Sequence, residues 1–155
     1  MAVERLEKHE LFGLLGPDDI QKLSNVSSIV AIKEGGKLYS EGVPASHLFV
    51  LLKGRVELRR RTGSGPSFVV EDLMEGSIFG VSALMGTERY LLNAECVMDS
   101  EVLKIEGKTL RRILDENPVV GYATQRRISQ VFFKRYLEVM ERLQAVVQAI
   151  PLGRK

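Results

Sequence analysis

The stretch from Val26 to Gly107 restricts the fold most, because it consists of short strand-like segments separated by glycine-containing turns. Apolar and polar residues alternate along several of these segments, which is typical of strands with one buried face. Leu48–Leu52 is instead almost continuously apolar and predicts a central strand buried on both faces. The strand-like segments are 27–33, 37–40, 48–52, 55–59 and 67–73. Many short strands at this spacing predict a small all-β sandwich or roll.

Helical patterns flank the β region on both sides. Before it, apolar residues recur at helical spacing up to Leu15, and Pro17 begins a second helix. After it, a short helix ends before Pro118 and a long amphipathic helix follows. The predicted parts are N-terminal helices over 1–25, a β-roll over 26–107 and C-terminal helices over 108–150, including a long helix over 119–150. The predicted fold class is therefore mainly β with flanking helices.

The composition is that of an ordinary soluble chain, with 45% hydrophobic and 27% charged residues among 155. A net charge of +2 at pH 7 is too small to indicate a nucleic-acid partner. No apolar run approaches the roughly 20 residues of a membrane span, and the N-terminus lacks the apolar core of a signal peptide. Cys96 is the single cysteine, which excludes an internal disulfide framework. We expect a cytoplasmic protein with no membrane partner.

Residues 78–96 come closest to a binding-site pattern. Gly80 lets the backbone approach a neighbouring group closely, and Ser82–Met85 can form one helical turn whose first N–H groups have no partner within the helix. Free N–H groups at the start of a helix bind anions, phosphate above all. The basic Arg89 follows within reach, and a strand is expected over 90–98.

This segment resembles the phosphate-binding cassette of the cyclic-nucleotide-binding domain family. Phe79-Gly80, Ala83-Leu84 and the alternation of Ala94 with Cys96 match the cassette pattern. The preceding order of a glycine turn, an apolar strand and a Gly-x-Val hairpin matches as well, so the resemblance covers about residues 10–117. It implies a β-roll, that is, a double-stranded β-helix of jelly-roll-like arrangement. It also implies a regulatory role in signal transduction, with cAMP or cGMP as the ligand and no required cofactor.

Two positions depart from the cassette pattern. Val81 stands where the family has a glutamate that accepts the ribose 2′-hydroxyl, and an ungapped count puts Tyr90 in place of the phosphate-binding arginine. In one register Arg89 reaches inward instead. In the other, which the spacing to Ala94 and Cys96 favours, Arg89 points to solvent and Tyr90 occupies the pocket. The candidate ligand-binding residues are Gly80, Val81, Ser82, Ala83, Arg89, Tyr90 and Leu91.

The residues at positions 81 and 90 leave two interpretations of the pocket open. Apolar side chains fill a vestigial pocket, or the pocket persists for a ligand less polar than a cyclic nucleotide. In the second case Ser82 and the amides from Gly80 to Ala83 would hold an anionic end of the ligand. Weak binding of cAMP or cGMP is expected, because two charge-assisted contacts of the family are missing.

Apolar residues recur every three or four positions along the predicted helix 119–150. A second row, at Phe133, Leu137, Met140 and Val147, lies beside the first. One β-roll offers little surface for so wide a stripe, so we expect a homodimer. In the family, the equivalent helix covers the pocket and often pairs two subunits. The residues expected at the dimer face are Ile128, Phe132, Tyr136, Val139, Leu143 and Val146.

Transcription factors of the family, such as the catabolite activator protein, continue after this helix into a winged helix-turn-helix that binds DNA. The present sequence ends at Lys155 without such a pattern, so we expect no direct binding to nucleic acid. The favoured hypothesis is a sensory module that responds to a small ligand. The alternative is a ligand-free module for dimerisation or for docking to an unknown protein partner.

No residue pattern predicts catalysis or a metal site. A metal enzyme on a β-roll needs several histidines and a carboxylate that converge, but His9 and His47 lie in separate segments without ligand spacing. Cys96 has no histidine near it in the sequence and is predicted to be a small core residue. We expect a protein that is not an enzyme.

Overall fold

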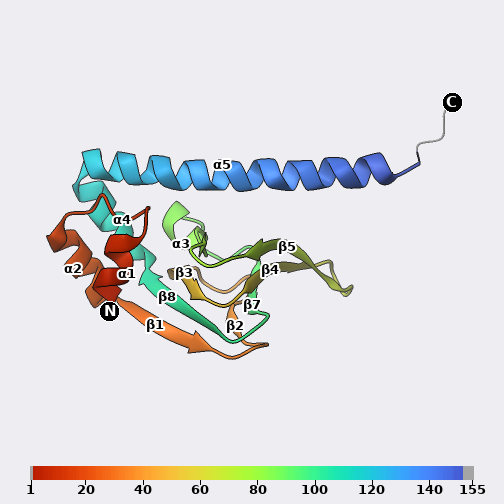
Figure 1. Ribbon diagram of the computed structural model, residues 1–155, viewed down its shortest axis with the longest axis horizontal. Coiled ribbons are helices and arrows are strands. Elements are labelled where there is room, and N and C mark those ends of the chain that lie inside the picture. Colours follow the sequence, from red (N-terminus) through yellow and green to blue (C-terminus); the bar gives the residue numbers. More distant parts are fainter. Residues whose placement is uncertain (1, 152–155) are drawn as a thin grey trace.

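The structure is a computed structural model that describes residues 2–151. The elements are α1 (Ala2–Lys8), α2 (Pro17–Asn25), β1 (Ser27–Ile32), β2 (Lys37–Tyr39), β3 (His47–Lys53), β4 (Val56–Arg61), β5 (Ser67–Leu73), β6 (Ile78–Phe79), α3 (Ser82–Met85), β7 (Asn93–Cys96), β8 (Ser100–Glu106), α4 (Gly107–Glu116) and α5 (Pro118–Ala149). Two antiparallel sheets, with strand orders β1-β8-β3-β6 and β2-β7-β4-β5, form the roll. Helices α1, α2 and α4 gather at one end, and α5 runs along the roll (Figure 1). The predicted β-roll with flanking helices and a long C-terminal helix is confirmed.

Strand β3 lies inside its sheet, between β8 and β6, and separates two apolar clusters. Phe49 and Leu51 belong to the cluster between the two sheets. Leu48 and Val50 belong to the other cluster, which lies between the roll and the helices and is here called the helical cluster. The prediction of a strand buried on both faces is therefore confirmed, since successive side chains of a strand point to opposite faces.

The N-terminal region covers the helical side of β3. Helix α1 ends at Lys8, and turns continue the chain to α2. The His9 carbonyl accepts the N–H groups of both Phe12 and Gly13, which closes these turns. Leu11 and Phe12 are nevertheless buried in the helical cluster. The short helix predicted from the apolar spacing is thus present over the first part of this segment, and Leu11, Phe12 and Leu15 after it are buried.

Helices α4 and α5 meet at Asn117 and pack closely beside it. Gly107 begins α4, so the helix starts one residue before the predicted bound. A Cβ at Gly121 would lie 2.1 Å from the Leu114 carbonyl oxygen, so only glycine permits this approach of the two backbones. The contact fixes the direction in which α5 leaves α4 and runs over the roll.

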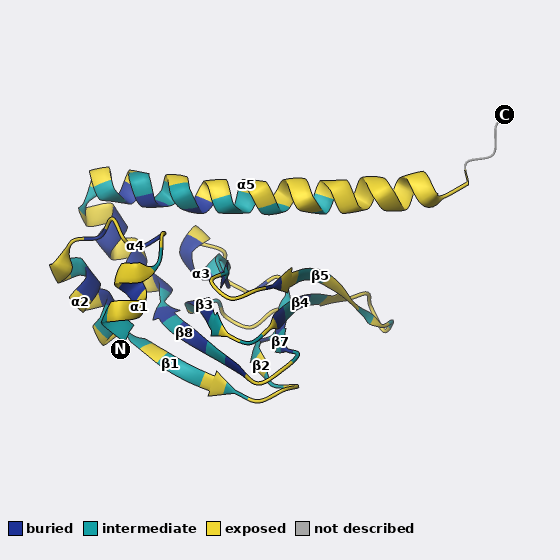
Figure 2. Ribbon diagram, in the orientation of Figure 1, coloured by how far each residue is buried: buried dark blue, intermediate teal, exposed yellow. Residues whose placement is uncertain are grey.

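Helix α5 has two faces of opposite character (Figure 2). On the inner face Gly121, Thr124 and Ile128 are buried, and Ile128 is only 1% exposed. From Met140 onward every described residue of the helix is exposed. The exposed residues include an apolar row in alternating steps of three and four, here called the outer seam. The outer seam is Phe133, Tyr136, Met140, Leu143, Val147 and Ile150, the last directly after the helix.

The predicted dimer face mixes these two faces and needs correction. Ile128 belongs to the protein's own core and is not free to meet a partner, and Phe132 is half-buried against the same cluster. The reason is helical phase, because alternating steps of four and three from Ile128, to Phe132, Arg135 and Val139, follow the inner face of α5. Tyr136, Leu143 and Val146 are exposed, whereas Val139 is half-buried.

Candidate ligand-binding site

The turn after β6 brings the backbone close to strands β2 and β3. Gly80 has a φ of +73°, and a Cβ there would lie 3.1 Å from the His47 carbonyl oxygen and 3.3 Å from the Tyr39 ring. The left-handed conformation and the close neighbours both favour glycine. The close backbone approach expected of this position is present, with strands of the roll as its neighbours.

The short helix α3 offers fewer free amides than the sequence suggested. The Ala83 N–H donates to the Gly80 carbonyl at 3.2 Å, and the Leu84 N–H donates to the Val81 carbonyl at 2.8 Å. Ala83 is buried against Gly107 of α4. The expectation that the Ala83 amide holds an anion is therefore wrong, because the turn itself uses this N–H.

Arg89 does not line the cavity. It is exposed, and its Nη1 donates to the Gly42 carbonyl at 2.6 Å. The next residue pairs with the same loop, since the Tyr90 N–H donates to the Val43 carbonyl at 3.0 Å. Strand β7 accordingly begins only at Asn93, and the predicted strand over 90–98 is too long. These hydrogen bonds to the loop place Arg89 outside and Tyr90 inside.

Tyr90 forms one wall of the site. Its side chain stacks on Tyr39, with ring centroids 3.9 Å apart and an interplanar angle of 12°, and the residue is only 5% exposed. Its hydroxyl donates to the His47 carbonyl and accepts the His47 N–H at 3.1 Å. Burial raises the pKa of both tyrosines, which keeps them neutral. The neutral ring of Tyr90, fixed by these contacts, therefore occupies the place that Arg89 would take in the other register.

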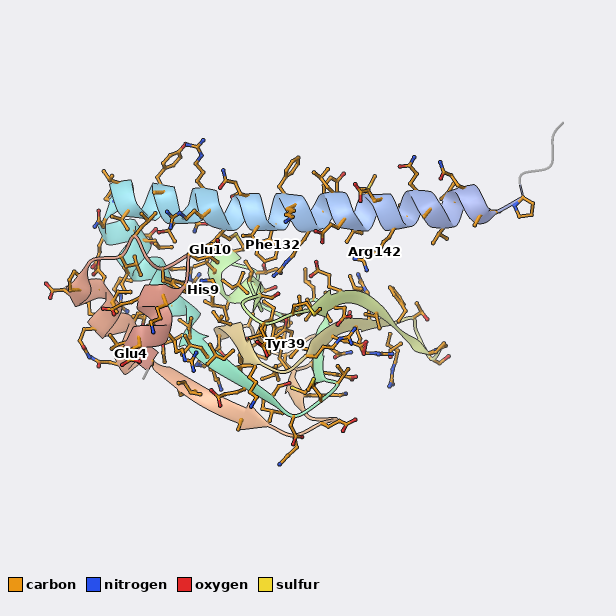
Figure 3. The ribbon with its side chains drawn as sticks, in the orientation of Figure 1. Glu4, His9, Glu10, Tyr39, Phe132 and Arg142 are labelled. Carbon is orange, nitrogen blue, oxygen red and sulfur yellow. The ribbon has the colours of Figure 1, made fainter. Side chains whose placement is uncertain are left out.

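A cavity of about 180 Å³ remains between this wall and α5. Of the predicted ligand-binding residues, Gly80, Val81, Ser82, Tyr90 and Leu91 line it, and Ala83 and Arg89 do not. Phe132 lies on the side of α5 that faces the roll, with Tyr39 in the roll below it (Figure 3). The same cavity also borders Phe132 and Arg135, so helix α5 supplies one of its walls.

Glu71 of β5 and Arg135 of α5 contribute opposite charges to this cavity. Arg135 Nη1 and Glu71 Oε2 are 3.9 Å apart, and the two side chains are 14% and 17% exposed. Burial raises the pKa of Glu71, and the positive charge of Arg135 opposes this shift. Burial also lowers the pKa of Arg135. The two charges therefore meet where water is largely excluded, and each depends on the other.

Neither member of this pair was predicted from the sequence to have a role. A signal was present for Arg135, which follows Ile128 by seven positions and Phe132 by three, and so lies on the buried line of α5. For Glu71 the signal is weaker, because strand β5 contains charged residues at neighbouring positions and its alternation is incomplete. Only the packing of α5 on β5 brings the two together.

The family of this chain follows from its match to a family model. The model of the cyclic nucleotide-binding domain matches residues 29–117, which is more than half of the chain. The chain belongs to the cyclic nucleotide-binding domain family. The matched residues include both sheets, the Gly80 turn and α4, so the match covers the roll that carries the site.

The proteins similar to this chain include regulatory proteins. The anaerobic regulatory protein of Bacillus subtilis (strain 168) is 26% identical over 110 residues, which are 70% of this chain and 46% of that protein. The chain thus spans about half the length of this relative. The sensor domain of the transcriptional regulator DNR from Pseudomonas aeruginosa is 25% identical, with a TM-score of 0.74 over 98% of this chain and 95% of that one. A candidate cyclic nucleotide-binding protein of Geobacter metallireducens GS-15 is also 25% identical, with a TM-score of 0.75 over 88% and 98%.

Members of the cyclic nucleotide-binding domain family share the backbone of the cassette, and this chain retains it. The glycine turn, the short helix and the long covering helix are all present. The side chains differ, since Val81 and Tyr90 offer neither the carboxylate nor the guanidinium of the family pattern. The chain is therefore a sensor-type regulatory domain of this family, and the lining of its cavity departs from the family pattern.

Within residues 2–151, no helix has the length and apolar character that a membrane crossing requires. No three His, Cys, Asp or Glu side chains come together as metal ligands in that part of the chain. Cys96 is buried in the cluster between the sheets, as predicted for a core residue, and burial raises the pKa of its thiol.

Proposed function

We propose that this protein is a sensor domain that binds a ligand smaller and less polar than a cyclic nucleotide in the cavity under α5. The observation that carries this proposal is the fixed, buried Tyr90, which occupies the position of the family's phosphate-binding arginine. Because Phe132 and Arg135 also line the cavity, a ligand there contacts α5 directly. Movement of α5 about the junction at residues 116–118 is then the output, as in ligand-responsive members of the family.

The size of the cavity argues against cAMP and cGMP as tight ligands. Sites for drug-sized ligands measure about 300–1,000 Å³, whereas this cavity measures about 180 Å³. The chain also lacks the carboxylate and the guanidinium that bind ribose and phosphate in the family. Each such charge-assisted hydrogen bond contributes about 1.5–3 kcal/mol, so the loss of two weakens binding by about two to four orders of magnitude.

Isothermal titration into protein that has been unfolded and refolded to remove carried-over ligand tests this proposal. We expect no micromolar binding of cAMP or cGMP by the wild type, and measurable binding by the double variant Val81→Glu/Tyr90→Arg. The single variant Arg89→Gln serves as the control, because Arg89 is exposed and bonded to Gly42. Micromolar binding by the wild type that Arg89→Gln abolishes would contradict the proposed lining.

A neutral single-ring molecule, benzamide, then tests the cavity itself. Added to ¹⁵N-labelled protein, it should shift the amide signals of Gly80, Ser82 and Leu92, and also signals along the first half of α5. Shifts confined to other surfaces, or no shift at solubility-limited concentration, would contradict the cavity as the ligand site.

We also propose that the protein is a homodimer through the outer seam of α5. Steps of three and four over six apolar residues give the a and d positions of a two-stranded coiled coil. When two α5 helices pair through their outer seams, the inner face of each helix stays packed on its own β-roll. Both subunits can then respond to a ligand. A seam of this length left in water would be an aggregation hazard.

A ligand-free docking module is the second candidate function. It is favoured by the outer seam alone, which requires a partner whether or not the cavity is used. The two candidates differ in the response of α5 to a cavity ligand, which only the sensor predicts. In both, the role is regulatory rather than catalytic, the compartment we propose is the cytoplasm, and neither requires nucleic acid to bind to these residues.

A further inference from the structure

Arg135 carries a buried donor that the protein itself leaves unused. Its Nη1 has no hydrogen-bond partner within residues 2–151, and that atom is buried. Glu71, the closest carboxylate, lies 3.9 Å away, which is too far for a hydrogen bond. An unused donor on a buried cation is costly, and such groups in native structures call for an explanation, an unrecorded ligand among them.

The surroundings of this cation are mostly aromatic and aliphatic. The guanidinium carbon of Arg135 lies 4.8 Å from the centroid of the Phe132 ring. Stacked Tyr39 and Tyr90 form another part of the lining, and Leu58 and Leu92 add aliphatic surface. Ser82 contributes a hydroxyl. A ligand that matches this lining has an apolar, flat body and a single anionic group that reaches Arg135.

The volume limits the size of that body. An engineered apolar cavity of about 150 Å³ accommodates benzene, and the present cavity of about 180 Å³ has room for one ring and one small polar group. Two fused rings or a nucleoside exceed it. A planar carboxylate suits the guanidinium best, because the two can form parallel hydrogen bonds.

We propose that Arg135 binds the carboxylate of a small single-ring carboxylic acid whose ring lies against Tyr39, Tyr90 and Phe132. This inference rests on the proposed function, since it assigns the ligand class and the anchoring residue of the same cavity. The anchoring cation then comes from helix α5, not from the cassette. Ligand binding therefore pulls directly on the helix that carries the outer seam.

Glu71 competes with such a ligand for Arg135. Other charges near the pair are Glu138 and Arg142 on α5, and Tyr39 in the roll is neutral because burial raises its pKa. When the ligand carboxylate occupies Arg135, Glu71 loses its attraction to the helix. Removing the charge of Glu71 should accordingly tighten the binding of a carboxylate and leave that of a neutral ring unchanged.

Benzoate and benzamide, which differ in charge and hardly in shape, test the proposal by ¹⁵N NMR titration of the whole chain. We expect both to shift the Gly80, Ser82 and Leu92 amides, with benzoate binding about tenfold to a hundredfold more tightly. Arg135→Gln should abolish this preference, and Glu71→Gln should increase it. Lys134→Gln removes the same charge from the neighbouring exposed position of α5 and should change nothing.

The neutral pair Glu71→Gln/Arg135→Gln keeps the test valid if Arg135→Gln alone fails to fold, because it leaves no unpaired buried charge. This double variant should bind benzoate no better than benzamide. If both probes bind the cavity equally in the wild type, the assignment to Arg135 is overturned and the proposed sensor function stands. Benzoate shifts confined to residues outside the cavity would overturn both.

Discussion

The inner and outer faces of helix α5 differ in how far they are packed against the rest of the protein. The inner face packs on the protein itself: Gly121 lies against α4, Ile128 fills the helical cluster, and Arg135 lies 3.9 Å from Glu71. The outer face carries apolar side chains in water, with Phe133 62% and Leu143 53% exposed. One helix thus combines a packed surface that positions it and an open surface that needs a partner.

This difference teaches how a ligand signal could cross the helix. A helix transmits motion as a rigid unit, so a ligand that contacts the inner face at Arg135 also displaces the outer seam. The inner face makes specific contacts through Gly121, Ile128 and Arg135, whereas the outer seam needs only apolar residues at regular spacing. Substitutions on the inner face should therefore affect folding and ligand binding, whereas substitutions on the outer seam should affect dimer assembly.

The largest effect is expected on the outer seam. Leu143→Glu places a charge at the centre of the proposed dimer contact, twice per dimer, and should weaken association by about 3 kcal/mol, or about a hundredfold. Sedimentation velocity over a concentration series measures the monomer fraction. Unfolding of the monomer should be unchanged, because Leu143 is exposed.

Gln148→Glu is the matched control for this change. It adds the same charge five residues further along α5 at an exposed position outside the outer seam. It should leave the dimer intact. A dimer that survives Leu143→Glu would show that the two copies meet elsewhere, and a chain that is monomeric without any substitution would contradict the dimer itself.

The inner face should respond more modestly and in a different measurement. Gly121→Ala puts a methyl group 2.1 Å from the Leu114 carbonyl oxygen, so α5 must move away from α4. We expect a cost of about 3 kcal/mol from overpacking, offset by roughly 1 kcal/mol of improved helix propensity. Urea denaturation should therefore show a net loss of about 2 kcal/mol.

The same substitution at Gly13 provides the comparison. A Cβ there would meet its nearest atom, the His9 carbonyl oxygen, at an ordinary 3.5 Å, and φ is not in the left-handed region. Gly13→Ala should keep or slightly raise stability. Equal losses at Gly13 and Gly121 would indicate that the close contact between α4 and α5 does not determine the effect.

The sequence was informative where side-chain pattern alone determines structure. The apolar run Leu48–Leu52 predicted a doubly buried strand, and the long apolar stripe predicted α5 to within one residue at each end. The phase of that stripe was less certain, because apolar residues occur on both faces of α5. Only the packing of Ile128 into the helical cluster separates the inner face from the outer seam.

The candidate site could be predicted in its backbone and less well in its chemistry. Gly80 and the cassette order gave its location, and the spacing to Ala94 favoured Tyr90 inside and Arg89 outside. The Ala83 amide was misassigned, because the hydrogen bond that closes a single helical turn is invisible in a residue pattern. Glu71 and Arg135 are 64 positions apart in the chain, so their meeting depends on how α5 lies over β5.

The smallest predicted effect concerns pH and the charged pair on the inner face. Burial raises the pKa of Glu71 in the folded protein above its value in the unfolded chain. The folded state therefore binds this proton more tightly, so the contribution of Glu71 to stability is largest at acidic pH and is lost as pH rises through the folded pKa. The nearby groups are Arg135 and Arg142, which oppose the shift, and Glu138, which adds to it.

Urea denaturation of the wild type and of Glu71→Gln over a range of pH measures the pH-dependent contribution of Glu71 to the free energy of unfolding. As pH rises above the ordinary pKa of a glutamate carboxyl group, the wild type should lose stability relative to the variant, because only the wild type must ionise a buried carboxyl group. Glu141→Gln, at an exposed position of α5 that is not among the groups acting on Glu71, is the control and should leave this difference unchanged. If the difference between wild type and Glu71→Gln grew in the opposite direction, the attraction of Arg135 would outweigh the burial of Glu71. The inner face would then hold a stabilising ion pair, and a competing ligand carboxylate would have to displace it.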